Sequence, residues 1–187
     1  RGFANYISTG GKRRRIAAFF NVAGILSIIH TRGLVYCDLS DKNMYISNAQ
    51  DKNVVWMIDV DNINYITVTS KRDGIFSPGY VAPEVLRGKG NTFYSDIFSF
   101  AIALFWNLTG QHPFVGPQLE EKLDEEEFLS ETEETFACGC DVEWIRDEEN
   151  DENYSDTPVP YELLVGEKLH NCFKKTFSRT GRHKRLT

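Results

Sequence analysis

The sequence predicts a predominantly helical α+β fold, in which short β-hairpins lie between long helices. Apolar residues recur at helical spacing over residues 15–33, residues 97–108 are apolar on nearly every face, and residues 161–177 form a third helical pattern. Residues 44–46 and 54–58 are short runs of β-forming side chains separated by a polar turn. Long helices interrupted by such short strands indicate the α+β class.

The length and composition indicate one globular domain. The chain has 187 residues, of which 41% are hydrophobic, which is enough for one buried core. No apolar run reaches the roughly 18 residues that a membrane span needs, so we expect no membrane association. The sequence begins with Arg1 and has no signal-peptide pattern. We therefore expect a piece of a longer, cytoplasmic protein.

The cysteines do not predict a disulfide framework. Cys37, Cys138, Cys140 and Cys172 are too few and too irregularly spaced for one. Cys138 and Cys140 could ligate a metal, but no second Cys or His pair lies near them in the sequence. We expect ordinary reduced thiols.

The first helix is predicted from an apolar stripe that starts after a polar and basic segment, residues 1–14. Residues 8–11 read as a turn, and Gly33 is a suitable C-terminal cap. The stripe is expected to be core: Ile16, Phe19, Phe20, Ala23, Leu26 and Ile29. His30, in the last turn, is expected to be a packed or capping histidine.

Residues 36–43, Tyr-Cys-Asp-Leu-Ser-Asp-Lys-Asn, carry the polar groups around which the chain is organised. Asp38 and Asn43 lie five positions apart, and the strand 54–58 leads into Asp59. Pairing the strands 44–46 and 54–58 brings Asn43 and Asp59 to the same end of a hairpin. Two carboxylates and one amide suit a magnesium ion that also binds phosphate oxygens.

The remaining elements follow in order. Residues 62–84 contain a polar loop, the turn Ser77-Pro78-Gly79 and Ala82-Pro83-Glu84. Ser95 or Asp96 is expected to cap the buried helix 97–108, which ends at Gly110. The helix 161–177 is expected to bury Leu163, Leu164, Leu169, Phe173 and Phe177 on one face. A basic tail, residues 179–187, closes the chain.

Residues 119–156 form an acidic block. They contain 17 acidic residues against Lys122 and Arg146, a local net charge of −15. Like charges at this density oppose compaction. We expect a flexible, loosely packed insertion, despite Phe128, Phe136 and Trp144.

The order of Asp38, Asn43, Asp59 and Ala82-Pro83-Glu84 resembles the large C-terminal lobe of protein kinases over almost the whole chain. The resemblance identifies residues 36–43 as the catalytic loop and residues 62–84 as part of the activation segment. It implies ATP and Mg²⁺ as cofactors and a protein substrate. By position, Asp38 would accept the substrate hydroxyl proton, while Asn43 and Asp59 would bind magnesium and hence the nucleotide.

The resemblance also assigns supporting residues. Lys42 would steady the transferred phosphate, and Ser77 falls where Ser/Thr kinases have a hydroxyl near the catalytic Asp. Asp96 would hold the backbone of the catalytic loop. Glu84 would form a buried ion pair with Arg185, with Arg182 as the alternative partner.

Several positions depart from the family pattern. Tyr36 and Cys37 replace His and Arg, so the loop lacks the arginine that binds a phosphorylated activation loop. Ser40 replaces a lysine. Asp59-Val60-Asp61 replaces Asp-Phe-Gly, which leaves Asp61 open as an alternative metal ligand. This triplet, with Gly-Gln-His-Pro-Phe at residues 110–114, looks most like bacterial eukaryotic-like kinases.

The small N-terminal lobe of kinases has no counterpart here. The sequence has no glycine-rich loop and no strand lysine, so residues 1–187 correspond to a C-terminal lobe whose partner lobe is expected upstream in the same protein. Without that lobe we expect an inactive, aggregation-prone fragment with apolar surface exposed around Leu34, Val35 and Met44.

Three functions remain open from the sequence. The first is an ATP- and Mg²⁺-dependent protein kinase that phosphorylates Ser or Thr. The second is a pseudokinase, a binding or scaffold module that kept the fold. The third is a small-molecule phosphotransferase, which the Ala-Pro-Glu segment disfavours. Seven Lys and Arg over residues 168–185 leave a phosphate- or nucleic-acid-binding tail as a further alternative.

Overall fold

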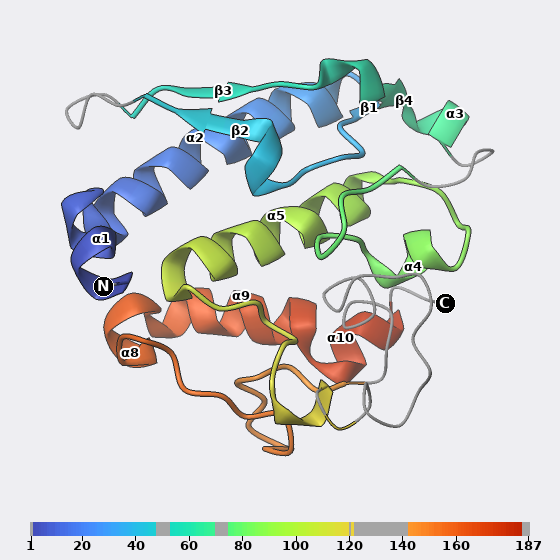
Figure 1. The fold of residues 1–187 in the computed structure, drawn as a ribbon. Helices are drawn as coiled ribbons and strands as arrows, with labels where there is room; N and C mark the ends of the chain where they lie inside the picture. Colours follow the sequence, from blue (N-terminus) through green and yellow to red (C-terminus); the bar gives the residue numbers. More distant parts are fainter. Residues whose placement is uncertain (1, 48–52, 70–74, 120, 122–141, 185–187) are drawn as a thin grey trace.

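Two long helices, α2 (Gly11–Thr31) and α5 (Phe93–Thr109), form the centre of the molecule. The computed structural model describes residues 2–47, 53–69, 75–119, 121 and 142–184. Figure 1 shows α5 between α2 on one side and α9 (Glu167–Phe177) on the other, with a β-hairpin lying over α2. The predicted α+β class, rich in helix, is confirmed. No helix in the described part of the chain is long and apolar enough to span a bilayer.

The N-terminal segment is more helical than predicted. Helix α1 (Gly2–Ser8) precedes α2, and α2 starts at Gly11 rather than at residue 15. Gly10 and Gly11 both have positive φ, 92° and 55°, which reverses the chain between the helices. The Arg15 guanidinium lies 4.0 Å over the Tyr6 ring and ties α1 to α2. Apolar periodicity does not reveal a contact between a cation and a ring, so α1 was not predicted.

Two small antiparallel sheets support the polar loops. β1 (Leu34–Val35) pairs with β4 (Asn64–Tyr65). β2 (Met44–Ile46) pairs with β3 (Val55–Met57) in the register Met44↔Met57 and Tyr45↔Trp56. The 3₁₀ turns η1 (Asp41–Asn43) and η2 (Val60–Asn62) lie at the end of this hairpin, and the short helices α3 (Ile66–Thr69) and α4 (Pro83–Leu86) follow.

Helix α5 is the buried centre of the core, as its apolar pattern predicted. The rings of Phe98 and Phe105 on α5 pack edge to face or stacked against aromatic side chains from the C-terminal half. These partners are Phe114, Trp144, Phe173 and Phe177. The predicted cap was wrong. Thr92 is the N-cap, and it forms a capping box with Ser95, while Gly110 ends the helix with φ 77°.

The single helix predicted over residues 161–177 is two helices, α8 (Tyr161–Leu164) and α9. Gly166 lies between them in extended conformation as the N-cap of α9. This break shifts the helical phase, so Leu163 is 67% exposed, whereas Phe173 and Phe177 reach the core. Helix α10 (Arg179–Lys184) follows in the basic tail.

The acidic block is not loosely packed where the structure describes it. Val142, Trp144 and Ile145 are fully buried, and Asn153 is 0% exposed. The Asn153 amide donates to the backbone carbonyls of Phe114 and Glu143. In residues 142–156 the apolar side chains of Val142, Trp144 and Ile145 therefore pack into the core despite the acidic residues around them. Residues 120 and 122–141 lie outside the described residues.

Candidate active site

The Asp38 carboxylate is fixed by donors from three segments of the chain. Its Oδ1 accepts a hydrogen bond from the Ser77 hydroxyl at 2.6 Å. Its Oδ2 accepts from the amide nitrogens of Asn43 at 3.2 Å and Asn62 at 3.3 Å. The Ser40 hydroxyl lies 3.2 Å from that of Ser77. The half-buried carboxylate therefore has a defined orientation, which a general base needs.

Asn43 and Asp59 meet at the end of the hairpin, as the strand pairing predicted. The Ile58 N–H donates to the Asn43 carbonyl at 3.0 Å, and Asp59 is the next residue. Asp59 is exposed and adopts a left-handed conformation, with φ 57°. Asp61, the alternative ligand, is exposed on η2.

The oxygen atoms at this end suit a hard cation. The Asn43 amide nitrogen donates to the Asp38 carbonyl at 2.8 Å and to its carboxylate, so Oδ1 of Asn43 is the atom left to bind a metal. Asp59 adds a carboxylate. Within the described residues no three His, Cys, Asp or Glu side chains cluster as a complete metal cage. Few protein ligands, supplemented by phosphate and water, are typical of Mg²⁺.

Asp96 anchors the loop that carries Asp38. Its carboxylate is 1% exposed and accepts from the backbone N–H groups of Tyr36 at 2.8 Å and Cys37 at 3.0 Å. His30 Nε2 lies 2.8 Å from the same carboxylate, so His30 is a packed histidine at the end of α2. These bonds hold Cys37 at φ 72°, a conformation that is costly for a residue with a side chain.

The two residues before Asp38 are uncharged. Burial, and then the carboxylates of Asp38, Asp59 and Asp96, raise the pKa of the Tyr36 phenol, which donates to the Ile58 carbonyl. Burial, aided by Asp96, raises the pKa of the Cys37 thiol to about 12. Tyr36 therefore links the loop that carries Asp38 to the strand that leads into Asp59.

Lys42, Glu84 and Arg182, which the sequence also assigned to the site, make none of the contacts described above with Asp38. Lys42 is exposed on η1 and makes no hydrogen bond or ion pair with another described residue. Glu84 is buried in α4, but Arg185 lies outside the described residues. Arg182 lies 3.9 Å from Glu143 and donates to the Val142 carbonyl.

Sequence reasoning missed several polar residues that touch the site. Asn62 binds the Asp38 carboxylate, Ser40 lies beside Ser77, and Asn91 bonds to the backbone of Cys37. Asn62 follows Asp59 by three residues, so proximity in the sequence is a weak signal for it. Asn91 is 54 residues from Cys37, and no local pattern could have indicated it.

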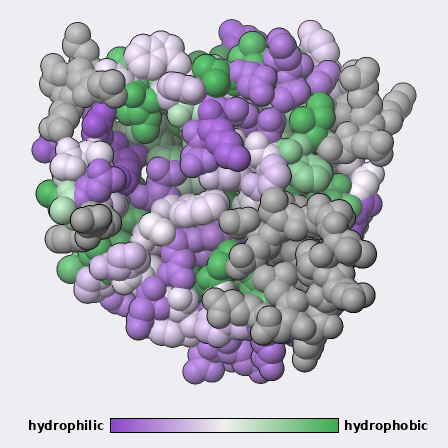
Figure 2. Space-filling view, viewed as in Figure 1, coloured by the Kyte–Doolittle hydropathy of each residue, from purple (hydrophilic) through white to green (hydrophobic). Residues whose placement is uncertain are grey.

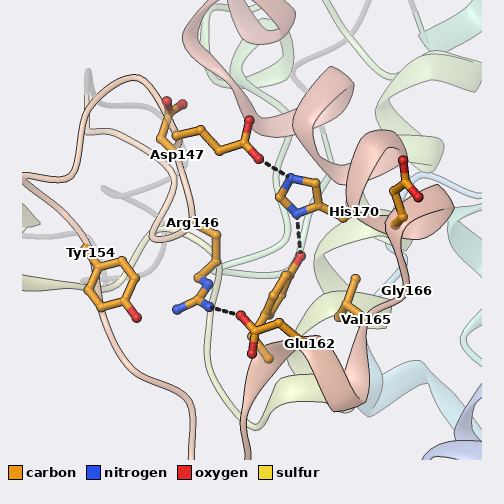
Figure 3. Close-up of a pocket in the computed structure, with 10 residues that line it drawn as sticks. Arg146, Asp147, Tyr154, Glu162, Val165, Gly166 and His170 are labelled. Carbon is orange, nitrogen blue, oxygen red and sulfur yellow. Dashed lines mark hydrogen bonds and ion pairs between the residues drawn. The ribbon is translucent and has the colours of Figure 1, made fainter.

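A separate pocket of about 480 Å³ lies beside α8 and α9 and does not contain these residues. His170 Nδ1 lies 3.1 Å from the Tyr161 hydroxyl, and His170 Nε2 lies 3.1 Å from the Glu148 carboxylate. Figure 3 shows Arg146 paired with Glu162 in the same pocket as His170. The Arg146 guanidinium also lies over the rings of Tyr154 and Tyr161. Arg146, Glu162, His170, Glu148 and Tyr161 thus contact one another within the pocket, whereas Tyr154 donates to Asp156 outside it.

Comparison with known proteins assigns the family. The protein kinase domain family matches residues 8–180, nearly the whole chain. The chain belongs to the protein kinase domain family. The match covers every element from α2 to α9 and includes the Asp38 site.

Curated relatives of this kinase-family chain are serine/threonine kinases by name. It is 34% identical over 96 residues to "Probable serine/threonine-protein kinase 2" of Plasmodium falciparum, which is 51% of this chain and 19% of that protein. It is 32% identical over 87 residues to human "Serine/threonine-protein kinase D3", 46% of this chain and 10% of that protein.

A bacterial relative is also similar, "Probable serine/threonine-protein kinase PknB" of Lactococcus lactis, with 30% identity over 95 residues, 51% of this chain and 15% of that protein. The matched segments thus span less than a fifth of each of these three relatives. Because they come from eukaryotes and a bacterium, the resemblance to bacterial kinases stays a prediction.

Proposed function

We propose that this chain is the catalytic lobe of a kinase that transfers the γ-phosphate of ATP, with Mg²⁺, to a Ser or Thr hydroxyl of a protein. The observation that carries the proposal is the carboxylate of Asp38, oriented by Asn43 and Ser77 within one loop cluster. Membership of the protein kinase domain family supports the reaction class.

Each residue has a distinct task in this proposal. Asp38 accepts the proton of the substrate hydroxyl, and Ser77 keeps the carboxylate turned toward the activation segment. Oδ1 of Asn43 and the Asp59 carboxylate would hold the metal. When bound, Mg²⁺ would neutralise charge on the phosphate oxygens. Lys42, exposed on η1, is free to extend toward the transferred phosphate.

The outer face of the hairpin is the surface we assign to the nucleotide and to a small N-terminal lobe in cis. Tyr45 and Trp56 are directly opposite each other in the register and are 58% and 53% exposed. Val54 and Ile58, on either side of β3, are 44% and 40% exposed. Apolar side chains at such exposure favour a covering partner.

The apolar surface differs from the one predicted. Val35 is 0% exposed, and Leu34 and Met44 are half-buried. Alternation along the strands explains the difference, because Met44 and Met57 point to the α2 side of the hairpin while Tyr45 and Trp56 point away from it. Figure 2 shows apolar groups, in green, among polar ones on the face in view, including the upper edge.

The proposal is tested by γ-phosphate transfer with the full-length protein. Asp38→Asn should lower kcat by about 10²–10⁴-fold, the usual contribution of a general base, with an unchanged Tm. The matched control is Asp151→Asn, an exposed acid in the 142–156 segment, which should retain full activity. Activity of Asp38→Asn equal to that of the control would refute the assignment of the base.

The second candidate function is a pseudokinase scaffold, which the departures at Tyr36, Cys37 and Asp61 favour. Full-length protein that binds ATP but transfers no phosphate would establish it in place of the kinase. Transfer to a small molecule but to no protein would support the third hypothesis, a small-molecule phosphotransferase.

A further inference from the structure

Asn91 bridges the catalytic loop and the activation segment. It precedes α5 and is 4% exposed. Its Oδ1 accepts the Ile75 N–H at 2.9 Å, and its Nδ2 donates to the Ile75 carbonyl at 2.8 Å. The same Nδ2 donates to the Cys37 carbonyl at 3.2 Å. One buried amide therefore binds both backbone groups of Ile75 and one of the catalytic loop.

The segment after Ile75 is also fastened at its other end. The Ser99 hydroxyl donates to the Tyr80 carbonyl at 2.7 Å, and His112 Nε2 lies 2.8 Å from the Gly79 carbonyl. Ser77, between the two anchors, meets Asp38 at 2.6 Å. The position of the Ser77 hydroxyl thus depends on residues that hold the backbone on both sides of it.

Besides the hydrogen bond from Ser77 to the Asp38 carboxylate, the neutral amide of Asn91 connects the loop and this segment. Cys37 is buried, and its thiol donates to the Val35 carbonyl. A thiol carries no positive charge, so this position offers none to a phosphate. The hydrogen bonds of Asn91 join backbone groups only, and their strength does not depend on a charge on the segment.

We propose that Asn91 is a positioning residue that fastens residues 75–77 to the catalytic loop, so that Ser77 stays aligned with Asp38 without phosphorylation of the activation segment. This inference rests on the proposed function, because it concerns the regulation of the same site. A misplacement of about 1 Å at such a site can lower the rate by about 100-fold.

The test compares variants of the full-length protein. Asn91→Ala removes all three bonds, and Asn91→Asp places a carboxylate oxygen against the carbonyls of Cys37 and Ile75. The matched control is Asn153→Ala. Asn153 is also fully buried, donates to two carbonyls and accepts one N–H, from Gln118, in the C-terminal half of the chain.

Three measurements decide the proposal. Both Asn91 variants should lower kcat for the protein substrate by about 10- to 100-fold, with KM for ATP unchanged, whereas Asn153→Ala should lower Tm but leave kcat of the folded protein unchanged. Treatment of the wild type with a protein phosphatase, checked by intact mass, should leave the rate unchanged. Hydrogen exchange at the Ile75 amide should accelerate in Asn91→Ala and not in Asn153→Ala.

Equal kcat for Asn91→Ala and Asn153→Ala, or loss of activity after phosphatase treatment, would overturn the proposal. Equal exchange at Ile75 in the wild type and Asn91→Ala would also overturn it. The exchange measurement needs no activity, so a wild type that transfers no phosphate would refute the proposed function while the anchoring by Asn91 is still decided.

Discussion

Asp96 shows how one buried side chain can fix the backbone of a catalytic loop. Its two oxygens receive two backbone N–H groups, from Tyr36 and Cys37, and contact His30. The side chain satisfies donors that could not otherwise be buried, since Tyr36 and Cys37 are buried as well. Its contribution is therefore to both stability and the site.

Replacing Asp96 by Ala should destabilise the protein strongly. The Tyr36 and Cys37 amides would be left buried without an acceptor, which costs about 3–5 kcal/mol in total. Urea denaturation measures this loss. The control is Asp151→Ala, at an exposed acid. A free energy of unfolding equal to that of the control would contradict this account of Asp96.

The two cysteines in the described part of the chain should differ in reactivity. With its pKa raised to about 12, and buried, Cys37 has only about one thiolate in 10⁴ at pH 8. Cys172 is exposed on α9. Iodoacetamide at pH 8 should label Cys172 and leave Cys37 unmodified until urea unfolds the chain. Rapid native labelling of Cys37, read by peptide mass spectrometry, would be inconsistent with its burial.

The same thiol makes stability depend on alkaline pH. In the unfolded chain it ionises near its ordinary pKa of 9.0, whereas in the folded protein it stays protonated to about 12. The unfolded state therefore binds fewer protons between these values, and stability falls as the pH rises through that interval, by up to about 1.4 kcal/mol per pH unit for this group.

At the scale of elements, the cap of a helix sets where the helix begins, which the apolar periodicity of the sequence does not show. The capping box joins the Thr92 hydroxyl to the Ser95 N–H at 3.3 Å and the Ser95 hydroxyl to the Thr92 N–H at 2.8 Å. It sets the start of α5 at Phe93, so that Asp96 lies in the first turn of the helix. The first turn of this helix thus orients the carboxylate that holds the catalytic loop.

Thr92→Ala should therefore lower the free energy of unfolding by about 1 kcal/mol, the usual cost of losing a threonine cap. The control is Thr176→Ala. Thr176 is half-buried within α9, and among the described residues its hydroxyl donates to the carbonyl of Cys172, one turn earlier. Thermal unfolding of both variants gives the comparison, and equal Tm values would count against a role for the cap.

The elements that could be predicted from the sequence are those whose pattern is local. The period of 3.6 residues indicated α2, α5 and α9, and the alternating strands placed Asn43 beside Asp59. Helix α1 has no apolar stripe of its own and packs on α2 through Arg15 over Tyr6, and the period alone did not show that Gly166 is extended. The motif spacing indicated Asp38, but the contact of Asn62 with its carboxylate and that of Asn91 with Cys37, 54 residues away, form only in the folded chain.

At the scale of the whole molecule, the hairpin presents an apolar face that the described part of the chain leaves exposed. Tyr45 and Trp56 pair across the strands, with Val54 and Ile58 beside them. The other face of the hairpin packs on α2 through Met44 and Met57. Asn43 and Asp59 adjoin the same hairpin, so a lobe that covers this face would also lie close to them.

The 187-residue chain alone should therefore self-associate and should transfer no phosphate. Positioning of the nucleotide can supply about 7–11 kcal/mol of a barrier, and the second half of its cradle is expected from the N-terminal lobe. Tyr45→Lys with Trp56→Lys should keep the isolated chain monomeric in light scattering. Leu163→Lys, at another exposed apolar residue, is the control. A monomeric wild-type fragment would contradict this expectation.

Because of the hairpin, the distance between Asn43 and Asp59 in the fold does not depend on how many residues separate them in the sequence. Asn43 and Asp59 are held together by the Met44↔Met57 pair and by the bond from Ile58 to Asn43, both at the end opposite the turn. Residues inserted between Ser47 and Asn53 would lengthen the sequence interval without moving either ligand. We therefore expect the spacing of Asn43 and Asp59 in the fold to tolerate insertions or deletions there. A search for this site that fixes the number of residues between the two ligands would overlook functional variants.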